Sequence, residues 1–546
     1  MELSLRYYQE GNLQQARHTC EEILQREPDN VMFLHFLGEI CYRLGDYPSA
    51  AAHITKSLEI NPVNADAYNN LGVVLKDMGR LEEAIRCYEQ LLRLQPDYPD
   101  AYANLGTIFR AKGKIAEAEM ACRRALQRDP NDFITHSNLL LTMNYNARHD
   151  AQFIYSEHLK FARRLAEPLS SATGPYHNEC VPGRRIRIGY VSPDFRRHSV
   201  NYFIEPVLAS HRHDQFGIFC YSDVPRADDV TARLQRYADQ WREIAGVPDE
   251  QVAEMIRKDG IDILVDLAGH TGDNRMLLFA RKPAPVQVSW LGYPNTTGLK
   301  AVDYRIVDGY TDPPGLTDPF YTEKLMRMPE SFLCYQPEQN SPETGPLPCQ
   351  KKGHITFGSF NFFAKVSPEV AVCWAELLQA VPASHLLLKT KSLSDKPTRE
   401  YAMEMFTQKG IERERIELLS YEHSYRGHLD MYNRIDIALD PFPYNGTTTT
   451  CEALWMGVPV ITLAGKTHAS RVGVSLLSNI GLPEFIAETP DEYVKMAFTL
   501  AADVNSLQSL RMRLRAAMEQ SPLTDAKRFT LNLENCLREM WQRYCA

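Results

Sequence analysis

The first 150 residues carry a pattern of small and apolar positions that repeats every 34 residues. In each unit a glycine and an alanine are followed by a leucine and then by a proline, always at the same spacing. This order predicts pairs of helices that pack closely at the glycine and alanine, with proline ending the second helix. The columns are Gly11, Gly45, Gly79 and Gly113; Ala16, Ala50, Ala84 and Ala118; Leu24, Leu58, Leu92 and Leu126; Pro28, Pro62, Pro96 and Pro130.

The order aromatic–x–x–Leu–Gly, then Gly, Ala and Pro, is that of the tetratricopeptide repeat. The unit at residues 1–29 is shortened, three fuller units occupy residues 30–131, and a further helix begins at Phe133. We therefore expect a tetratricopeptide superhelix over residues 1–168 and a linker over residues 169–183.

Three asparagines also stand 34 residues apart, at Asn70, Asn104 and Asn138. They fall on the first helix of each unit, which lines the concave surface of such a superhelix. An asparagine side chain both donates and accepts hydrogen bonds, so a row of them can hold the backbone of an extended peptide. The alternative is hydrogen bonding between helices. We favour peptide binding, because Phe36 interrupts the column where a packing role would keep asparagine.

From residue 185 onwards, short apolar runs typical of buried strands alternate with helical stretches. This alternation predicts parallel sheets covered by helices. The aperiodic segment 336–353 divides the region into one half at 184–335 and another at 354–546, whose last helix could pack on either half. The predicted strands are 185–192, 216–221, 261–267, 286–291, 304–307, 355–360, 386–389, 416–419, 435–439 and 460–463.

Residues 440–459 form the stretch with the strongest chemical signal. Asn445 and Gly446 turn the chain after a predicted strand, and four threonines then begin a helix. The free N–H groups and dipole at a helix start favour an anion, typically a phosphate. Threonine is also a favoured capping residue, so capping alone is the alternative. Glu452, one turn into the helix, could accept the two hydroxyls of a ribose.

Polar motifs follow four other predicted strands, at 192–198, 266–272, 291–298 and 358–365. A single histidine after a strand, such as His198 or His270, is usually structural, and Lys365 alone would usually be a solvated lysine. The recurrence of these motifs at the same end of successive strands favours a binding cleft, because ligands of parallel sheets bind at the carboxyl ends of strands.

Composition narrows the class of protein further. The net charge of −9 argues against a broad nucleic-acid surface, and 44% hydrophobic and 24% charged residues are ordinary for a globular protein. Twelve cysteines without paired CxxC spacing indicate reduced thiols. No signal-peptide pattern or apolar run of about 20 residues occurs. We therefore expect a cytoplasmic protein without nucleic-acid or membrane partners.

Several of these motifs together resemble the O-GlcNAc transferases, which combine tetratricopeptide repeats with a glycosyltransferase of the GT-B fold, built from two Rossmann-like α/β domains. The resemblance covers nearly the whole chain. It implies a nucleotide-sugar donor, usually UDP-GlcNAc, acceptor Ser and Thr hydroxyls of intracellular proteins, and neither metal nor cofactor. The matching segments are 189–192, 194–198, 281–285, 290–294, Asn361 with Lys365, 445–449, 454–455 and 469–472.

The resemblance also implies roles for individual residues. Lys365, with the helix start at 447–449, would stabilise the diphosphate leaving group as Mg²⁺ does elsewhere. His198 matches the proposed base, and Asp194 or a chain of waters is the rival proton acceptor. Glu452 would bind the ribose and His428 would lie by the uridine. The full set of expected nucleotide-sugar contacts is Asn361, His428, Tyr425, Thr447, Thr448, Thr449, Glu452, Gly292, Tyr293 and Pro294.

The chain departs from the animal enzymes at several places. The long domain between their catalytic halves is reduced to about twenty residues, Phe362 replaces a common glutamine, and Thr447 replaces a histidine. The run Gly269-His270-Thr271 is closer to bacterial and plant branches, one of which transfers fucose from GDP-fucose. The alternatives are therefore the same fold with another donor, or an inactive repeat scaffold that binds nucleotide.

Overall fold

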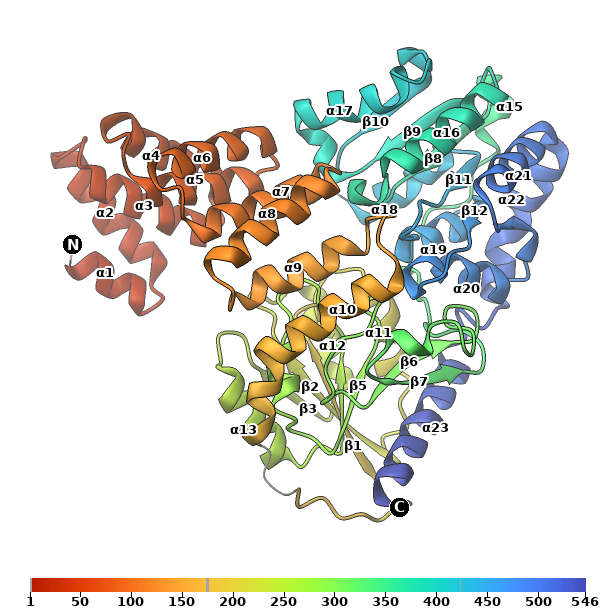
Figure 1. Cartoon of the computed structure of the whole chain (residues 1–546), viewed down its shortest axis with the longest axis horizontal. Helices are drawn as coiled ribbons and strands as arrows, with labels where there is room; N and C mark the ends of the chain where they lie inside the picture. Colours follow the sequence, from red (N-terminus) through yellow and green to blue (C-terminus); the bar gives the residue numbers. More distant parts are fainter. Residues whose placement is uncertain (1, 173–175, 423) are drawn as a thin grey trace.

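The computed structural model describes residues 2–172, 176–422 and 424–546. It confirms the predicted fold class, a helical repeat superhelix followed by two parallel α/β sheets (Figure 1). Ten helices form the repeat array: α1 (Glu2–Gln9), α2 (Leu13–Arg26), α3 (Val31–Leu44), α4 (Tyr47–Ile60), α5 (Ala65–Asp77), α6 (Leu81–Leu94), α7 (Pro99–Ala111), α8 (Ile115–Arg128), α9 (Phe133–Met143) and α10 (Ala151–Phe161).

Two different glycines organise each repeat. Gly45 and Gly79 end the first helix of their pairs with φ of 83° and 77°, a left-handed conformation that favours glycine. The close approach of the paired helices is instead at Gly72, where an added Cβ would lie 2.5 Å from the ring of Tyr88. The glycines of the 34-residue column are therefore turn residues, and not the contact positions we expected.

The amino-terminal α/β half contains a seven-stranded parallel sheet in the order β3-β2-β1-β4-β5-β6-β7. Its order reverses between β1 and β4, which places a ligand crevice at the carboxyl ends of those two strands. The strands are β1 (Ile186–Ser192), β2 (Phe216–Ser222), β3 (Gln240–Glu243), β4 (Ile263–Asp266), β5 (Val286–Ser289), β6 (Tyr304–Asp308) and β7 (Lys324–Met328). The helices are α11 (Asn201–Leu208), α12 (Asp229–Leu234), α13 (Asp249–Asp259) and α14 (Met276–Ala280).

The second half contains a six-stranded parallel sheet in the order β10-β9-β8-β11-β12-β13, with the reversal between β8 and β11. Its strands are β8 (Thr356–Ser359), β9 (His385–Lys389), β10 (Ile416–Leu419), β11 (Ile437–Leu439), β12 (Val460–Leu463) and β13 (Ile486–Ala487). The helices of this half are α15 (Pro348–Lys352), α16 (Pro368–Ala380), α17 (Lys396–Thr407), α18 (Tyr425–Asp430), α19 (Thr448–Trp455), α20 (Val472–Asn479), α21 (Pro490–Ala502) and α22 (Val504–Glu519).

Both faces of the first sheet are buried, because alternate residues of β4 enter different hydrophobic clusters. Val265 joins a cluster that includes Trp541 of the last helix, α23 (Ala526–Cys545). Leu264 joins a cluster that includes Phe161 of the repeat array. The last helix therefore packs on the amino-terminal half, and the end of the array covers the other face of the same sheet (Figure 1).

No helix in the described part of the chain is long and apolar enough to cross a membrane.

Candidate functional site between the two halves

Lys365 lies just beyond β8, where the strand order of the second sheet reverses. Its Nζ donates a hydrogen bond to the carbonyl oxygen of Asn445 at 2.7 Å and lies 4.3 Å from the ring centroid of Tyr444. Desolvation lowers the pKa of Lys365 below the usual lysine value, and the buried carboxylate of Asp440 opposes part of that shift. The structure thus holds an ammonium group in a poorly hydrated place, beside the predicted phosphate stretch.

The threonine-rich helix start lies beyond β11, the other strand at the reversal. Helix α19 begins at Thr448, and the side chain of the preceding Thr447 makes no capping hydrogen bond. Thr449 donates instead from Oγ1 to Oδ1 of Asn361 at 2.9 Å. Capping by Thr447 therefore does not account for these threonines, and the positive end of the helix remains available to an anion.

A cavity of about 260 Å³ lies between the two halves. His198 and Gly292 line it from the amino-terminal half, and Lys365 lines it from the carboxyl-terminal half. The cavity therefore brings together the motifs that follow β1, β5, β8 and β11. The other predicted site residues in its lining are Pro294, Asn361, Thr447, Thr448 and Thr449.

His198 and Asp194 form a pair at the end of β1. Their Nδ1 and Oδ1 atoms are 3.3 Å apart, and the backbone N–H of Val200 also points at Nδ1, at 3.4 Å. Burial lowers the pKa of His198 and raises the pKa of Asp194, and each partner opposes the shift of the other. Burial thus favours a neutral imidazole, which can accept a proton. Asp194 is buried behind His198, outside the cavity lining.

Glu452 is placed differently from our expectation. It is only 3% exposed, lies outside the cavity lining, and its carboxylate already accepts three hydrogen bonds. The donors are the hydroxyl of Tyr425 at 3.1 Å, the hydroxyl of Tyr432 at 3.0 Å and Nε2 of His428 at 2.9 Å. Contact with a ribose would have to displace one of these donors. No sequence motif pointed to Tyr432.

The side chain of Tyr293 also lies outside the cavity lining and turns toward the repeat array. Its hydroxyl accepts from Nδ2 of Asn144 at 3.0 Å and contacts Nε2 of His158 at 2.8 Å. His270 is buried beside it, with hydrogen bonds to Ser137 and Thr297, and burial lowers its pKa to about 3. Both residues therefore join the array to the amino-terminal half, and His270 has the structural role that a single histidine usually has.

His468 also lines the cavity, although none of the sequence motifs pointed to it. Its Nδ1 donates to the Asp312 carboxylate at 2.6 Å, which connects the two halves. Burial raises the pKa of Asp312, but the charge and the hydrogen bond of His468 outweigh this and lower it to about 2. The position of His468 just beyond β12, at the same edge as the other motifs, was the signal that could have identified it.

Two of the three asparagines of the array are used in contacts between helices. Asn70 donates from Nδ2 to Oε1 of Glu39 at 2.7 Å and contacts Nε2 of His35 at 2.9 Å. Asn138 accepts from the guanidinium of Arg110 at 3.3 Å. For these two positions the structure shows the inter-helix bonding that we ranked second, while Asn104 lies half-buried on α7.

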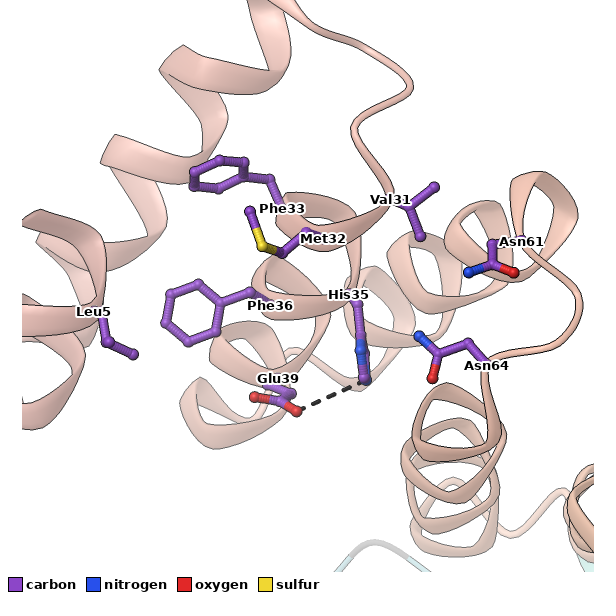
Figure 2. Close-up of a pocket in the computed structure, with 9 residues that line it drawn as sticks. All are labelled: Leu5, Val31, Met32, Phe33, His35, Phe36, Glu39, Asn61 and Asn64. Carbon is purple, nitrogen blue, oxygen red and sulfur yellow. Dashed lines mark ion pairs between the residues drawn. The ribbon is translucent and has the colours of Figure 1, made fainter. Parts of the chain in front are cut away.

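A second cavity, of about 480 Å³, opens beside these contacts at the first repeats (Figure 2). Leu5 of α1 and Met32 and Phe36 of α3 form its apolar part. The ion pair of His35 with Glu39, at 3.7 Å, lies at its polar side. The array therefore offers a mixed apolar and polar recess on its first helices, well separated in sequence from the cavity between the halves.

Comparison with known proteins agrees with this architecture. The sequence matches the family described as Glycosyl transferase family 41 over residues 135–341 and 347–533, and tetratricopeptide repeat families over 38–79 and 69–133. The O-GlcNAc transferase of Thermobaculum terrenum, solved as a mutant, superposes with a TM-score of 0.89 at 37% identity, covering 94% of this chain and 98% of that one.

Among curated relatives, the "Probable UDP-N-acetylglucosamine--peptide N-acetylglucosaminyltransferase SPINDLY" of Oryza sativa subsp. japonica is 45% identical over 77% of this chain and 46% of its own length. The UDP-N-acetylglucosamine--peptide N-acetylglucosaminyltransferase of Caenorhabditis elegans is 27% identical over 66% of this chain and 41% of its own length. The chain thus spans about half the length of the curated relatives it matches. By its family match and its identity to these relatives, the chain belongs to glycosyl transferase family 41.

Proposed function

We propose that this protein is an inverting glycosyltransferase that transfers GlcNAc from UDP-GlcNAc to Ser and Thr hydroxyls of proteins. The observation that carries the proposal is the cavity between the halves, where Lys365 and the start of α19 face His198. A cation and the N-terminus of a helix can bind a diphosphate. A neutral imidazole can accept the proton that the acceptor hydroxyl loses. The names of the relatives supply the donor and the acceptor class.

In the proposed reaction the acceptor oxygen attacks the anomeric carbon while the bond from that carbon to the UDP oxygen breaks. The acceptor proton passes to Nε2 of His198, directly or through water, in the ring tautomer whose Nδ1–H faces the Asp194 carboxylate. UDP leaves with the additional negative charge. Lys365 and the N–H groups at the start of α19 stabilise that charge, and a single displacement inverts the anomeric centre.

The same groups support a reaction without a metal ion, because the ammonium of Lys365 and the helix start supply the positive charge next to the diphosphate. We propose that the repeat array presents the acceptor protein, as tetratricopeptide arrays form extended concave binding surfaces. All twelve cysteines are free thiols, which supports a reducing compartment such as the cytoplasm.

The first test is calorimetric binding of UDP, UDP-GlcNAc, GDP and GDP-fucose in the presence of EDTA, to the wild type and to Lys365→Ala. We expect micromolar binding of UDP and UDP-GlcNAc that weakens in the variant. Mass spectrometry of peptide mixtures incubated with UDP-GlcNAc then detects the transferred sugar. Preference for GDP would contradict the proposed donor, and absence of any transfer despite nucleotide binding would favour the inactive scaffold.

A further inference from the structure

A small hydrophobic cluster next to Lys365 joins the repeat array to both α/β halves. The repeat array contributes three of its side chains, the amino-terminal half one and the carboxyl-terminal half two. The members are Ile115, Leu141 and Tyr145 from the array, Tyr293 from the first half, and Ala364 with Tyr444 from the second. Ala364 directly precedes Lys365 in the chain, so the cluster holds the segment that carries this lysine.

Tyr145 makes the most direct of these contacts. It lies in the turn after α9, and its ring stacks on the ring of Tyr444 with centroids 4.7 Å apart and planes at 11°. The ammonium of Lys365 lies 4.3 Å from the centroid of the same Tyr444 ring. A side chain of the repeat array is therefore separated from the ammonium by one aromatic ring, and the position of that ring depends on both of its neighbours.

The segment that precedes Lys365 rests on the array as well. The ring of Phe362 meets Tyr145 edge-on, with centroids 6.4 Å apart. The ring of Phe363 packs on Gly113, at the turn between α7 and α8, where an added Cβ would lie 3.2 Å from it. Lys365 is thus supported by the array through its own chain segment and through Tyr444.

We propose that Tyr145 is a positioning residue for Lys365, so that the repeat array forms part of the donor site in addition to any groove for acceptors. The inference rests on the proposed function, because it assigns Lys365 to the diphosphate. If the array formed only a groove for acceptors, damage to the array would affect only protein acceptors. Under our proposal, a change in the array also alters the binding and hydrolysis of the donor when no acceptor protein is present.

A double-mutant cycle on UDP binding tests this proposal without requiring activity. Tyr145→Leu keeps an apolar side chain in the cluster but removes the stacked ring, and Tyr145→Phe keeps the ring. We expect Tyr145→Leu to weaken UDP binding about fivefold, the size of one stacked aromatic pair. In the Lys365→Ala background the same change should have less than about a 1.5-fold effect, since the group it positions is gone.

The matched control is Tyr88→Leu, which removes another buried tyrosine ring from the array, where it packs on Gly72. We expect it, like Tyr145→Phe, to leave UDP affinity unchanged. The wild type, Tyr145→Leu, Tyr145→Phe and Tyr88→Leu are then compared in hydrolysis of UDP-GlcNAc, with water as the acceptor. We expect Tyr145→Leu to lower kcat about tenfold with little change in KM, since the ammonium acts most strongly on the leaving group.

The proposal is overturned if Tyr145→Leu weakens UDP binding equally in both backgrounds, because the tyrosine would then not act through Lys365. It is also overturned if Tyr88→Leu has the same effect, since the cause would be general damage to the array. Failure of the proposed function has a different signature: the wild type would transfer no GlcNAc, while the cycle, measured with whichever of UDP and GDP the wild type binds, would still report whether Tyr145 positions the lysine.

Discussion

His428 donates a hydrogen bond from Nε2 to the buried carboxylate of Glu452 at 2.9 Å. The two residues come from α18 and α19, and Lys389 contacts the other ring nitrogen of the histidine. Glu452 is therefore the centre of a polar network, and its first role is to hold α18 against α19. This role and a contact with ribose make different predictions.

We expect Glu452→Ala to lower the free energy of unfolding by about 2 kcal/mol or more, because three donors lose their acceptor. Glu452→Gln should cost less, since the amide oxygen still accepts. Urea denaturation measures both values. If Glu452 instead binds the ribose, the alanine variant would keep its stability and lose the ability to distinguish UDP from 2′-deoxy-UDP.

Lys365→Ala should lower the rate of GlcNAc transfer by a thousandfold or more, which corresponds to about 4 kcal/mol of transition-state stabilisation. The reason is that its ammonium is placed to offset the charge developing on the diphosphate. Steady-state kinetics with a peptide acceptor provides the measurement. A variant that retained a tenth of the wild-type kcat would remove Lys365 from the mechanism.

The lowered pKa of Lys365 predicts a pH effect with a definite sign. Desolvation favours the neutral amine, so the ammonium is lost as pH rises, and at a lower pH than for a solvated lysine. UDP affinity should therefore fall on the alkaline side, below the pH at which ordinary lysines titrate. Lys365→Arg keeps its charge and should move this loss to higher pH. An unchanged profile in Lys365→Arg would assign the pH effect to another group.

The asparagine column predicts two separate effects. Asn70→Ala should lower the stability of the array by about 1 kcal/mol, because it removes the donor to Glu39. Asn104→Ala should leave stability unchanged and raise KM for protein acceptors while UDP-GlcNAc hydrolysis continues. Thermal unfolding and the two kinetic assays separate these effects. A stability loss in Asn104→Ala would extend the structural role to the whole column.

A buried ion pair links the repeat array to the carboxyl-terminal half. Nζ of Lys112 lies 3.4 Å from the Asp395 carboxylate, and both side chains are at most 5% exposed. Lys112→Met leaves this carboxylate without its cation and should cost about 3 kcal/mol. The exposed pair of Arg80 with Glu83 is the control, where Arg80→Met should change stability by less than about 1 kcal/mol. Calorimetry of both variants gives the values; equal losses would show that burial of the pair does not matter.

The sequence was sufficient where a local pattern decides the structure. The 34-residue period and the apolar runs predicted the repeat superhelix and every central strand. The short strands β3, β7 and β13 were missed, because edge strands are less buried and their sequences lack a continuous apolar run. The polar motifs at the strand ends also predicted residues that line the cavity, such as His198 and Lys365.

Contacts between residues that are far apart along the chain could not be predicted from the sequence. Tyr293 lies in a motif at the correct strand end, but Asn144 and His158, more than a hundred residues earlier, hold its hydroxyl away from the cavity. His468 enters the lining because Asp312 of the other half orients it. Neither partner is visible in a local motif, so the direction of these two side chains needed the structure.

The packing of α23 on the first sheet has a consequence for how the two halves are connected. The chain leaves the amino-terminal half near residue 335 and returns to it for α23, so the whole second sheet is topologically an insertion in the first half. The outgoing and returning segments lie side by side, since the N–H of Tyr335 donates to the carbonyl oxygen of Leu523 at 2.6 Å. A chain cut before residue 526 would keep every residue of the cavity but would lose α23, which forms one side of the hydrophobic core of the first half.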